Sequence, residues 1–236
     1  MRVGLKERRL EVEEVISFVF DLGGRPFEYR PGQYAFCELD TLDFPDERGN
    51  RRHFTISSSP TEKGIVMFTT RMRGSGFKET LRHATLGYEI NIGTLLGHFV
   101  MPEGEIRRHV FIAGGIGITP YRSMLRCAAD VKKPIDAVML YFSHSSADIV
   151  FRQELEEIAR QMATFSLVHV LSDPEPGWKG EKGRLNEALL RKWVPNLDQR
   201  LFWISGPPPM VTAYKQLVKQ TGVGDEAIRT DSFAGY

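Results

Sequence analysis

The chain has 236 residues, enough for one large or two modest domains, and its 42% hydrophobic and 26% charged residues are typical of a globular protein. Its 31 basic and 30 acidic residues give a formal net charge of +1, so no overall field attracts it to nucleic acid or to a membrane surface. No apolar run approaches the ~18 residues that span a bilayer, and no apolar segment follows the charged N-terminus as in a secretory signal. We therefore expect a cytoplasmic protein without nucleic-acid or membrane partners.

Short segments rich in β-branched and aromatic residues fill the first hundred residues, and glycine or proline turns separate them. The predicted strands are RLEVEEVISFVFDL (9–22), QYAFCELD (33–40), HFTISSS (53–59) and IVMFTTRM (65–72). Only KETLRHA (78–84) has a helical pattern. Many short strands with such turns favour an antiparallel β-barrel.

After about residue 106, apolar strands alternate with amphipathic helices. The predicted strands are HVFIAGG (109–115), AVMLYFS (137–143), FSLVHVLS (165–172) and LFWIS (201–205). The helix after the last strand aligns Met210, Ala213, Tyr214, Leu217 and Val218, and it should end near Gly222. This alternation predicts an α/β domain with a doubly wound parallel sheet. With MPEGEIRR as the border, the predicted domains are 1–105 and 106–236.

The segment FIAGGIGITP lies between the first of these parallel strands and its helix, where such domains bind phosphate. Gly115 and Gly117 let the backbone approach a pyrophosphate, while Thr119 and Pro120 begin a helix whose free N–H groups favour an anion. The alternative is a tight strand–helix connection without a ligand.

Two further strand ends could contact a nucleotide. The second parallel strand ends in Ser143, His144 and Ser145, with no acidic residue at its tip. These side chains could hold a 2′-phosphate, or they are ordinary loop residues, so NADPH and NADH both stay open. The fourth strand ends in Gly206, Pro207, Pro208 and Met210. The prolines could form a rigid wall for a planar ring, or only a stiff loop.

These motifs, in this order, resemble the ferredoxin–NADP⁺ reductase superfamily over nearly the whole chain, from RPGQY (30–34) to FAGY (233–236). The family's flavin signature is arginine, any residue, an aromatic residue, then serine or threonine, and here it is Arg52-His53-Phe54-Thr55. The resemblance implies that Arg52 contacts a flavin phosphate, that Phe54 packs against the isoalloxazine, and that Thr55 lies near N5. Phe54 replaces the usual tyrosine. Without the resemblance, this segment would be an ordinary strand.

A second family element is similar to FTTRMRGSGFKETL (68–81). The resemblance implies that Thr70 and Arg71 lie beside the flavin. It also implies that Gly76, Phe77 and Lys78 lie at the flavin phosphates, although the family often has serine near Lys78.

Two residues, Ser205 and Tyr236, concern the hydride transfer itself. Ser205 stands where the family commonly has cysteine beside the nicotinamide carbon, so we expect altered rather than abolished hydride transfer. The resemblance also implies that Tyr236 covers the flavin, the alternative being a frayed end.

The resemblance implies an FAD-dependent oxidoreductase, with FMN possible, that transfers a hydride between NADPH or NADH and the flavin. Thr55, Ser205 and Tyr236 would be its catalytic residues. A small electron-carrier protein such as a ferredoxin or flavodoxin would take single electrons, since Cys37 and Cys127 lack the spacing of a metal site or an iron–sulfur cluster. The alternatives are an NAD(P)H:flavin reductase that releases reduced flavin and a non-catalytic flavin-binding subunit. The electron acceptor, the direction of electron flow and the oligomeric state stay open.

Overall fold

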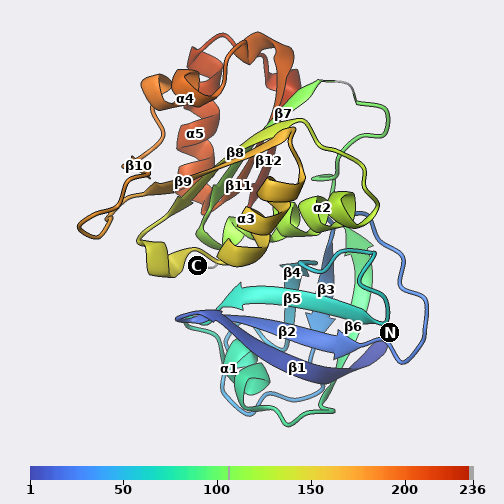
Figure 1. Ribbon diagram of the computed structural model, residues 1–236. Coiled ribbons are helices and arrows are strands. Elements are labelled where there is room, and N and C mark those ends of the chain that lie inside the picture. The colour runs from blue at the N-terminus through green and yellow to red at the C-terminus, as the bar shows by residue number, and fades with distance from the viewer. Residues whose placement is uncertain (106, 234–236) are drawn as a thin grey trace. The chain divides into compact units, whose positions relative to one another are not determined.

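A computed structural model describes residues 1–105 and 107–233 of the chain. Figure 1 shows two groups of strands, each with its own helices. Within these described ranges, every helix is too short or too polar to cross a membrane.

The chain forms two compact units, and each is described here by itself. The first contains Met1–Met101 together with Thr119–Cys127, and the second contains Pro102–Ile118 together with the chain from Ala128 onward. The first unit therefore includes Thr119–Cys127, a segment that follows the last strand of this unit in the chain.

The first unit contains a six-stranded antiparallel sheet, one complete helix and the segment Thr119–Cys127 (Figure 1). Its elements are β1 (Arg2–Val12), β2 (Val15–Asp21), β3 (Tyr34–Glu38), β4 (Arg51–Thr55), β5 (Ile65–Arg71), α1 (Gly76–His83) and β6 (Glu89–Leu96). The strand order is β4-β3-β6-β1-β2-β5, and an antiparallel bridge between Ile56 and Phe68 joins the two outer strands. The sheet thus closes on itself, which confirms the predicted antiparallel barrel.

The predicted strand at 9–22 is wrong in one respect, because the structure divides it into two. Val12 pairs directly with Val15, and Glu14 has a φ of +61°. Two charged residues therefore form a tight turn in a place where the sequence has no glycine, asparagine or proline to announce it.

The second unit is a parallel sheet between helices. Its elements are β7 (Arg108–Gly114), η1 (Gly115–Ile118), β8 (Ala137–Ser143), η2 (Ser146–Asp148), α3 (Arg152–Gln161), β9 (Phe165–Leu171), β10 (Glu181–Lys182), α4 (Glu187–Trp193), η3 (Leu197–Gln199), β11 (Arg200–Gly206), α5 (Pro208–Gln220), η4 (Asp225–Ala227) and β12 (Ile228–Ser232). Helix α2 (Thr119–Asp130) follows η1 in the chain, and its residues Thr119–Cys127 belong to the first unit. The strand order is β10-β9-β8-β7-β11-β12, and every pairing is parallel. Helices α4 and α5 cover one face and α3 the other (Figure 1), which confirms the doubly wound sheet.

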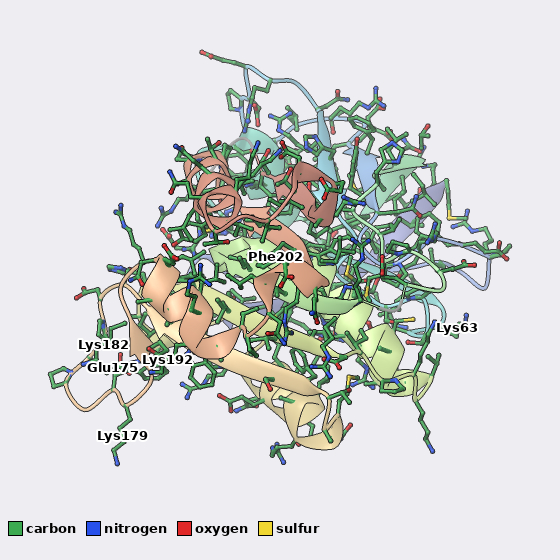
Figure 2. The ribbon with its side chains drawn as sticks, turned by 90° about the horizontal axis from the view of Figure 1, so that it is seen from above. Lys63, Glu175, Lys179, Lys182, Lys192 and Phe202 are labelled. Carbon is green, nitrogen blue, oxygen red and sulfur yellow. The ribbon has the colours of Figure 1, made fainter. Side chains whose placement is uncertain are left out.

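Alternating strand residues fill the core under α4 and α5, and Phe202, labelled in Figure 2, is fully buried there. Helix α5 buries Val211, Tyr214 and Val218 but leaves Ala213 exposed, so the expected position of Ala213 on the apolar face is wrong. Strands β10 and β12 were not predicted, because β10 has two residues and β12 reads IRTDS without an apolar run.

Candidate functional site

The flavin-signature residues lie on β4, an outer strand of the barrel sheet. Phe54 is half-buried at the margin of the barrel core, with ring centroids 6.1 Å from Phe68 and 5.8 Å from Phe77. Thr55, at the end of the strand, is 5% exposed. The aromatic ring and the hydroxyl are therefore held in place by packing before any ligand binds.

Arg52 is largely engaged by its own loop. Its Nη1 donates to the carbonyls of Arg48, Gly49 and Arg51 at 2.9, 3.0 and 2.7 Å, and its Nη2 donates to the carboxylate of Asp46. Its Nε is buried and has no hydrogen-bond partner among the described residues. The Nε–H is thus left for a ligand.

The N-terminus of α1 forms an anion cradle, because the N–H of Phe77 and the hydroxyl of Ser75 both point at one acceptor. That acceptor is Asp46 Oδ2, at 3.0 and 2.9 Å. Gly76 lies between these donors at the start of the helix. The sequence identified the cradle but not the carboxylate that occupies it.

Lys78 and its neighbours form the remaining part of this site. Lys78 is 5% exposed and its Nζ donates to the carbonyl of Arg71 at 2.8 Å. Burial, with Arg48 and Arg52 nearby, lowers the pKa of Lys78 to about 8. Thr70 is buried, and the Arg71 guanidinium lies 3.7 Å from Glu14. The structure therefore brings Arg52, Phe77 and Lys78 together at one end of the barrel.

A buried ion pair that the sequence did not indicate fixes the segment after Thr55. Arg122, on α2, donates from Nη1 to the carbonyl of Ser57 at 2.8 Å and makes a bidentate contact to Glu62 at 2.7 and 3.1 Å. The next residue, Ser123, donates from Oγ to the carbonyl of Ser58 at 2.6 Å. All these residues belong to the first unit. The one sequence feature that could have indicated this ion pair is the arginine within the otherwise apolar helical segment TPYRSML.

In the second unit, the predicted phosphate turn lies directly after β7. Gly115 has a φ of +51°, which favours glycine, and Tyr141 donates from its hydroxyl to the Gly115 carbonyl at 3.2 Å. A Cβ on Gly117 would overlap the carbonyl of Ser205, so glycine is needed for this turn to pack against β11. Helix α2 then begins at Thr119 with Pro120 in its first turn, as predicted.

Two buried hydroxyls lie at the carboxyl edge of the parallel sheet, one at the end of β8 and one near the end of β11. Ser143 Oγ and Ser205 Oγ are buried and have no hydrogen-bond partner among the described residues. Buried hydroxyls are normally paired, so two orphans at the edge where such sheets bind nucleotides indicate polar ligand groups.

The same edge holds an acidic residue that the sequence analysis did not place there. Strand β9 brings Ser172 and Asp173 beside His144, with His144 Nδ1 3.2 Å from Ser172 Oγ and Nε2 3.6 Å from the Asp173 carboxylate. The loop that follows β9 extends away from the sheet and carries Glu175 and Lys179 (Figure 2). Asp173 was missed because it follows a different strand from His144.

The end of β11 is rigid. Gly206 has a φ of +154°, Pro207 is the N-cap of α5, and Pro208 begins that helix. Met210 lies so close to Gly114 that a Cβ there would overlap its sulfur. These residues and the phosphate turn therefore form one packed group within the second unit.

Strand β12 places Asp231 beside Ser205, since the two residues are partners in the parallel register. Burial raises the pKa of Asp231 to about 6. The Phe233 N–H donates to the Gly206 carbonyl at 3.0 Å and holds the chain along this edge. Tyr236, assigned to cover a flavin, lies outside the described residues.

Comparison with known proteins agrees with this geometry. Residues 111–216 match the family model of the oxidoreductase NAD-binding domain. The glycine betaine monooxygenase reductase subunit of Chromohalobacter salexigens is 29% identical over 231 residues, which cover 94% of this chain and 61% of that protein. The reductase component of Rhodococcus jostii propane 2-monooxygenase is 28% identical, with coverages of 88% and 56%. The NAD-binding family model and these relatives support the ferredoxin–NADP⁺ reductase-like superfamily as the one that this chain resembles.

Solved structures of this superfamily have the same fold. The flavohem-like FAD/NAD-binding domain of Vibrio cholerae nitric oxide dioxygenase matches with a TM-score of 0.83 and 20% identity, over 98% of each chain. A ferredoxin NADP⁺ reductase from Neisseria gonorrhoeae, with bound FAD and NADP, matches with a TM-score of 0.80 and 16% identity, also over 98% of each chain. The chain spans 61% of the length of the glycine betaine reductase subunit.

The resemblance implies a flavin and a nicotinamide nucleotide, and the residues of this chain can be tested against both. The nucleotide fits, because the orphan hydroxyls of Ser143 and Ser205 lie at the expected sheet edge. The flavin ring fits beside Phe54 and Thr55, and the orphan Nε of Arg52 supplies one donor. The flavin phosphate fits poorly, because Asp46 already uses the donors of the α1 cradle.

Proposed function

We propose that the chain is an NAD(P)H-dependent flavoprotein reductase. A hydride passes between the nicotinamide nucleotide and a flavin, FAD or FMN, and single electrons go to a separate electron-carrier protein. In this proposal residues 1–105 hold the flavin and residues 106–236 hold the nucleotide. The observation that carries it is a pair of buried hydroxyls, Ser143 and Ser205, which have no partner among the described residues. They lie at the carboxyl edge of a parallel sheet whose strand β7 leads into the glycine turn.

The second unit binds and orients the nucleotide. The N–H groups of η1 and the start of α2 attract the pyrophosphate, and Ser143 with His144 contacts the ribose. The proline wall after Gly206 restricts the nicotinamide to one orientation, and the Ser205 hydroxyl contacts its edge. Positioning is the main contribution of these residues, because the cofactors supply the redox chemistry.

The first unit orients the flavin. Phe54 packs against the ring, Thr55 places a hydroxyl near N5, and the Arg52 Nε–H contacts the polar chain. The flavin would supply the change from two-electron to one-electron transfer, and these residues would hold it in place. We assign Tyr236 to cover the ring and exclude water before the nucleotide enters.

The names of the relatives support a separate electron acceptor. The Chromohalobacter protein is a monooxygenase reductase subunit, and the Rhodococcus protein is the reductase component of a propane monooxygenase. We propose that this chain likewise reduces a partner protein, a small electron carrier such as a ferredoxin or flavodoxin.

A second candidate is an NAD(P)H:flavin reductase that releases reduced flavin. The observation that favours it is the occupied anion cradle at α1, since a flavin held without its phosphate contacts exchanges more readily. Flavin that stays bound through gel filtration would count against this candidate.

The decisive experiment is an absorption spectrum of the purified chain after incubation with FAD or FMN, followed by anaerobic addition of NADPH and, separately, NADH. We expect flavin absorption that bleaches with at least one nucleotide. Gly117→Ala is the matched control, because it distorts the nucleotide turn and should leave the flavin bound but unbleached. A chain that takes up neither flavin would refute the proposed function.

A further inference from the structure

The segment between β3 and β4 places a carboxylate where a ligand phosphate is expected. We define the Asp46 loop as residues 41–50. The carboxylate of Asp46 accepts from the Phe77 N–H, the Ser75 hydroxyl, the Arg48 N–H and the Arg52 guanidinium. A helix N-terminus, a hydroxyl and an arginine are also the donors that an incoming phosphate would use.

The first residue of α1, Gly76, allows the Asp46 loop to lie directly against this helix. A Cβ on Gly76 would overlap the carbonyl oxygens of Phe44 and Pro45, although Gly76 has no positive φ that would itself require glycine. Glycine at this position is therefore explained by the close approach of the loop. The Asp43 N–H donates to Thr80 Oγ1 at 3.0 Å, which adds a further contact to the same helix.

The carboxylate is also strongly held as an anion. Its side chain is 6% exposed. Burial alone would raise its pKa, but the hydrogen bonds from Phe77, Ser75 and Arg48, with the charge of Arg52, lower the pKa of Asp46 to about 2. Asp46 is therefore ionised at every pH at which the protein would be assayed. Its carboxylate accepts the hydrogen bonds of the α1 cradle as a phosphate oxygen would.

We propose that Asp46 is an internal substitute for the flavin phosphate, so that this chain selects flavins by their ring and ribityl chain and gains little affinity from their phosphate. The inference rests on the proposed function, in that a flavin binds to the barrel. Its consequence is a specificity for the isoalloxazine and ribityl portion that riboflavin, FMN and FAD share. Arg52 Nε, which has no hydrogen-bond partner among the described residues, is a donor that remains at this site for a phosphate.

The experiment measures dissociation constants of riboflavin and FMN by quenching of flavin fluorescence, without any nicotinamide nucleotide. The ratio of the riboflavin constant to the FMN constant isolates the phosphate contribution from that of the ring. For the natural sequence we expect a ratio below about tenfold, and for Asp46→Asn a ratio at least about tenfold larger, through tighter FMN binding. A ratio that is unchanged or smaller in Asp46→Asn overturns the proposal.

Two further variants separate the cradle from other effects. Gly76→Ala keeps Asp46 but prevents the loop from seating, so its ratio should rise in the same direction. Asp43→Asn removes one negative charge from an exposed position of the same loop and should leave the ratio unchanged. An equal rise of the ratio in Asp43→Asn would show that net charge alone changes FMN affinity, and it would overturn the proposal. The proposal would also be overturned if the ratio rose in neither Gly76→Ala nor Asp46→Asn. Circular dichroism melting curves verify that each variant is folded.

The outcome is independent of the reductase activity. A chain that binds riboflavin and FMN equally but is not bleached by NADPH or NADH supports the role of Asp46 and contradicts the proposed reaction. A chain that is bleached but binds FMN more than about a hundredfold tighter than riboflavin supports the reaction and overturns the role of Asp46. If no flavin binds to any of the four proteins, both are refuted.

Discussion

Replacing Arg122 by methionine should destabilise the protein by about 3 kcal/mol, because it leaves Glu62 without its partner inside the first unit. The Arg122 side chain is 6% exposed and that of Glu62 is 21% exposed, so water can solvate the abandoned carboxylate only in part. The carbonyl of Ser57 loses its donor as well. Removing one partner of a fully buried pair costs about 3–5 kcal/mol, and the partial exposure of Glu62 places the value at the lower end.

Thermal unfolding followed by circular dichroism measures this cost. For a chain of this size, about 3 kcal/mol corresponds to a fall in Tm of roughly 8 °C. Arg152→Met is the matched control, because its pair with Glu156 is exposed on α3 and should contribute less than about 0.5 kcal/mol.

A double-mutant cycle tests the physical reason. Glu62→Gln should also destabilise the chain, but Arg122→Met combined with Glu62→Gln should cost little more than Arg122→Met alone. We expect a coupling free energy of at least about 1.5 kcal/mol between the two residues. Additive single effects, or a cost of Arg122→Met below about 1 kcal/mol, would refute the view that this pair anchors the segment after Thr55.

Three other substitutions test the second unit. Ser205→Ala should change the free energy of unfolding by less than about 1 kcal/mol, because the Ser205 hydroxyl has no partner among the described residues. The same substitution should slow anaerobic flavin reduction about tenfold, and an unchanged rate would show that Ser205 does not contact the nicotinamide. Since burial raises the pKa of Asp231 to about 6, the folded chain retains a proton that the unfolded chain releases near pH 4, and stability falls between about pH 4 and pH 6. Asp231→Asn should therefore be about 3 kcal/mol more stable than the natural sequence at pH 7.5 and no more stable at pH 4, and parallel pH profiles would contradict this. Asp173→Asn should raise kcat/KM for NADPH about fivefold relative to NADH by removing a negative charge near the ribose, and an equal change for both nucleotides would show that Asp173 does not face the 2′ position.

Patterns that are local in sequence predicted most of the fold. Alternation and turn residues indicated the barrel, and alternating strands and helices indicated the parallel sheet. The tight turn at Glu14 was missed because its residues are not typical turn formers, and β12 was missed because its burial depends on pairing with β11.

The site was predictable only where its residues are contiguous. The phosphate turn was identified because strand, glycines and helix follow one another. Asp46 in the α1 cradle and Glu62 beside Arg122 were not identified, because each partner lies 29 to 60 residues away and nothing in the intervening sequence marks the pairing. The resemblance supplied roles for Arg52 and Phe77 but not the carboxylate that engages both.

The position of α2 has a consequence for the order in which the chain folds during synthesis. All six barrel strands are complete at Leu96, but the helix that pairs with Ser58 and Glu62 begins only at Thr119, after β7 has been made. An N-terminal domain normally folds as a unit while the rest of the chain is still emerging from the ribosome. Here the nascent barrel must keep Glu62 without Arg122 until the first strand of the next sheet has left the ribosome, so the completion of the first unit depends on the beginning of the second.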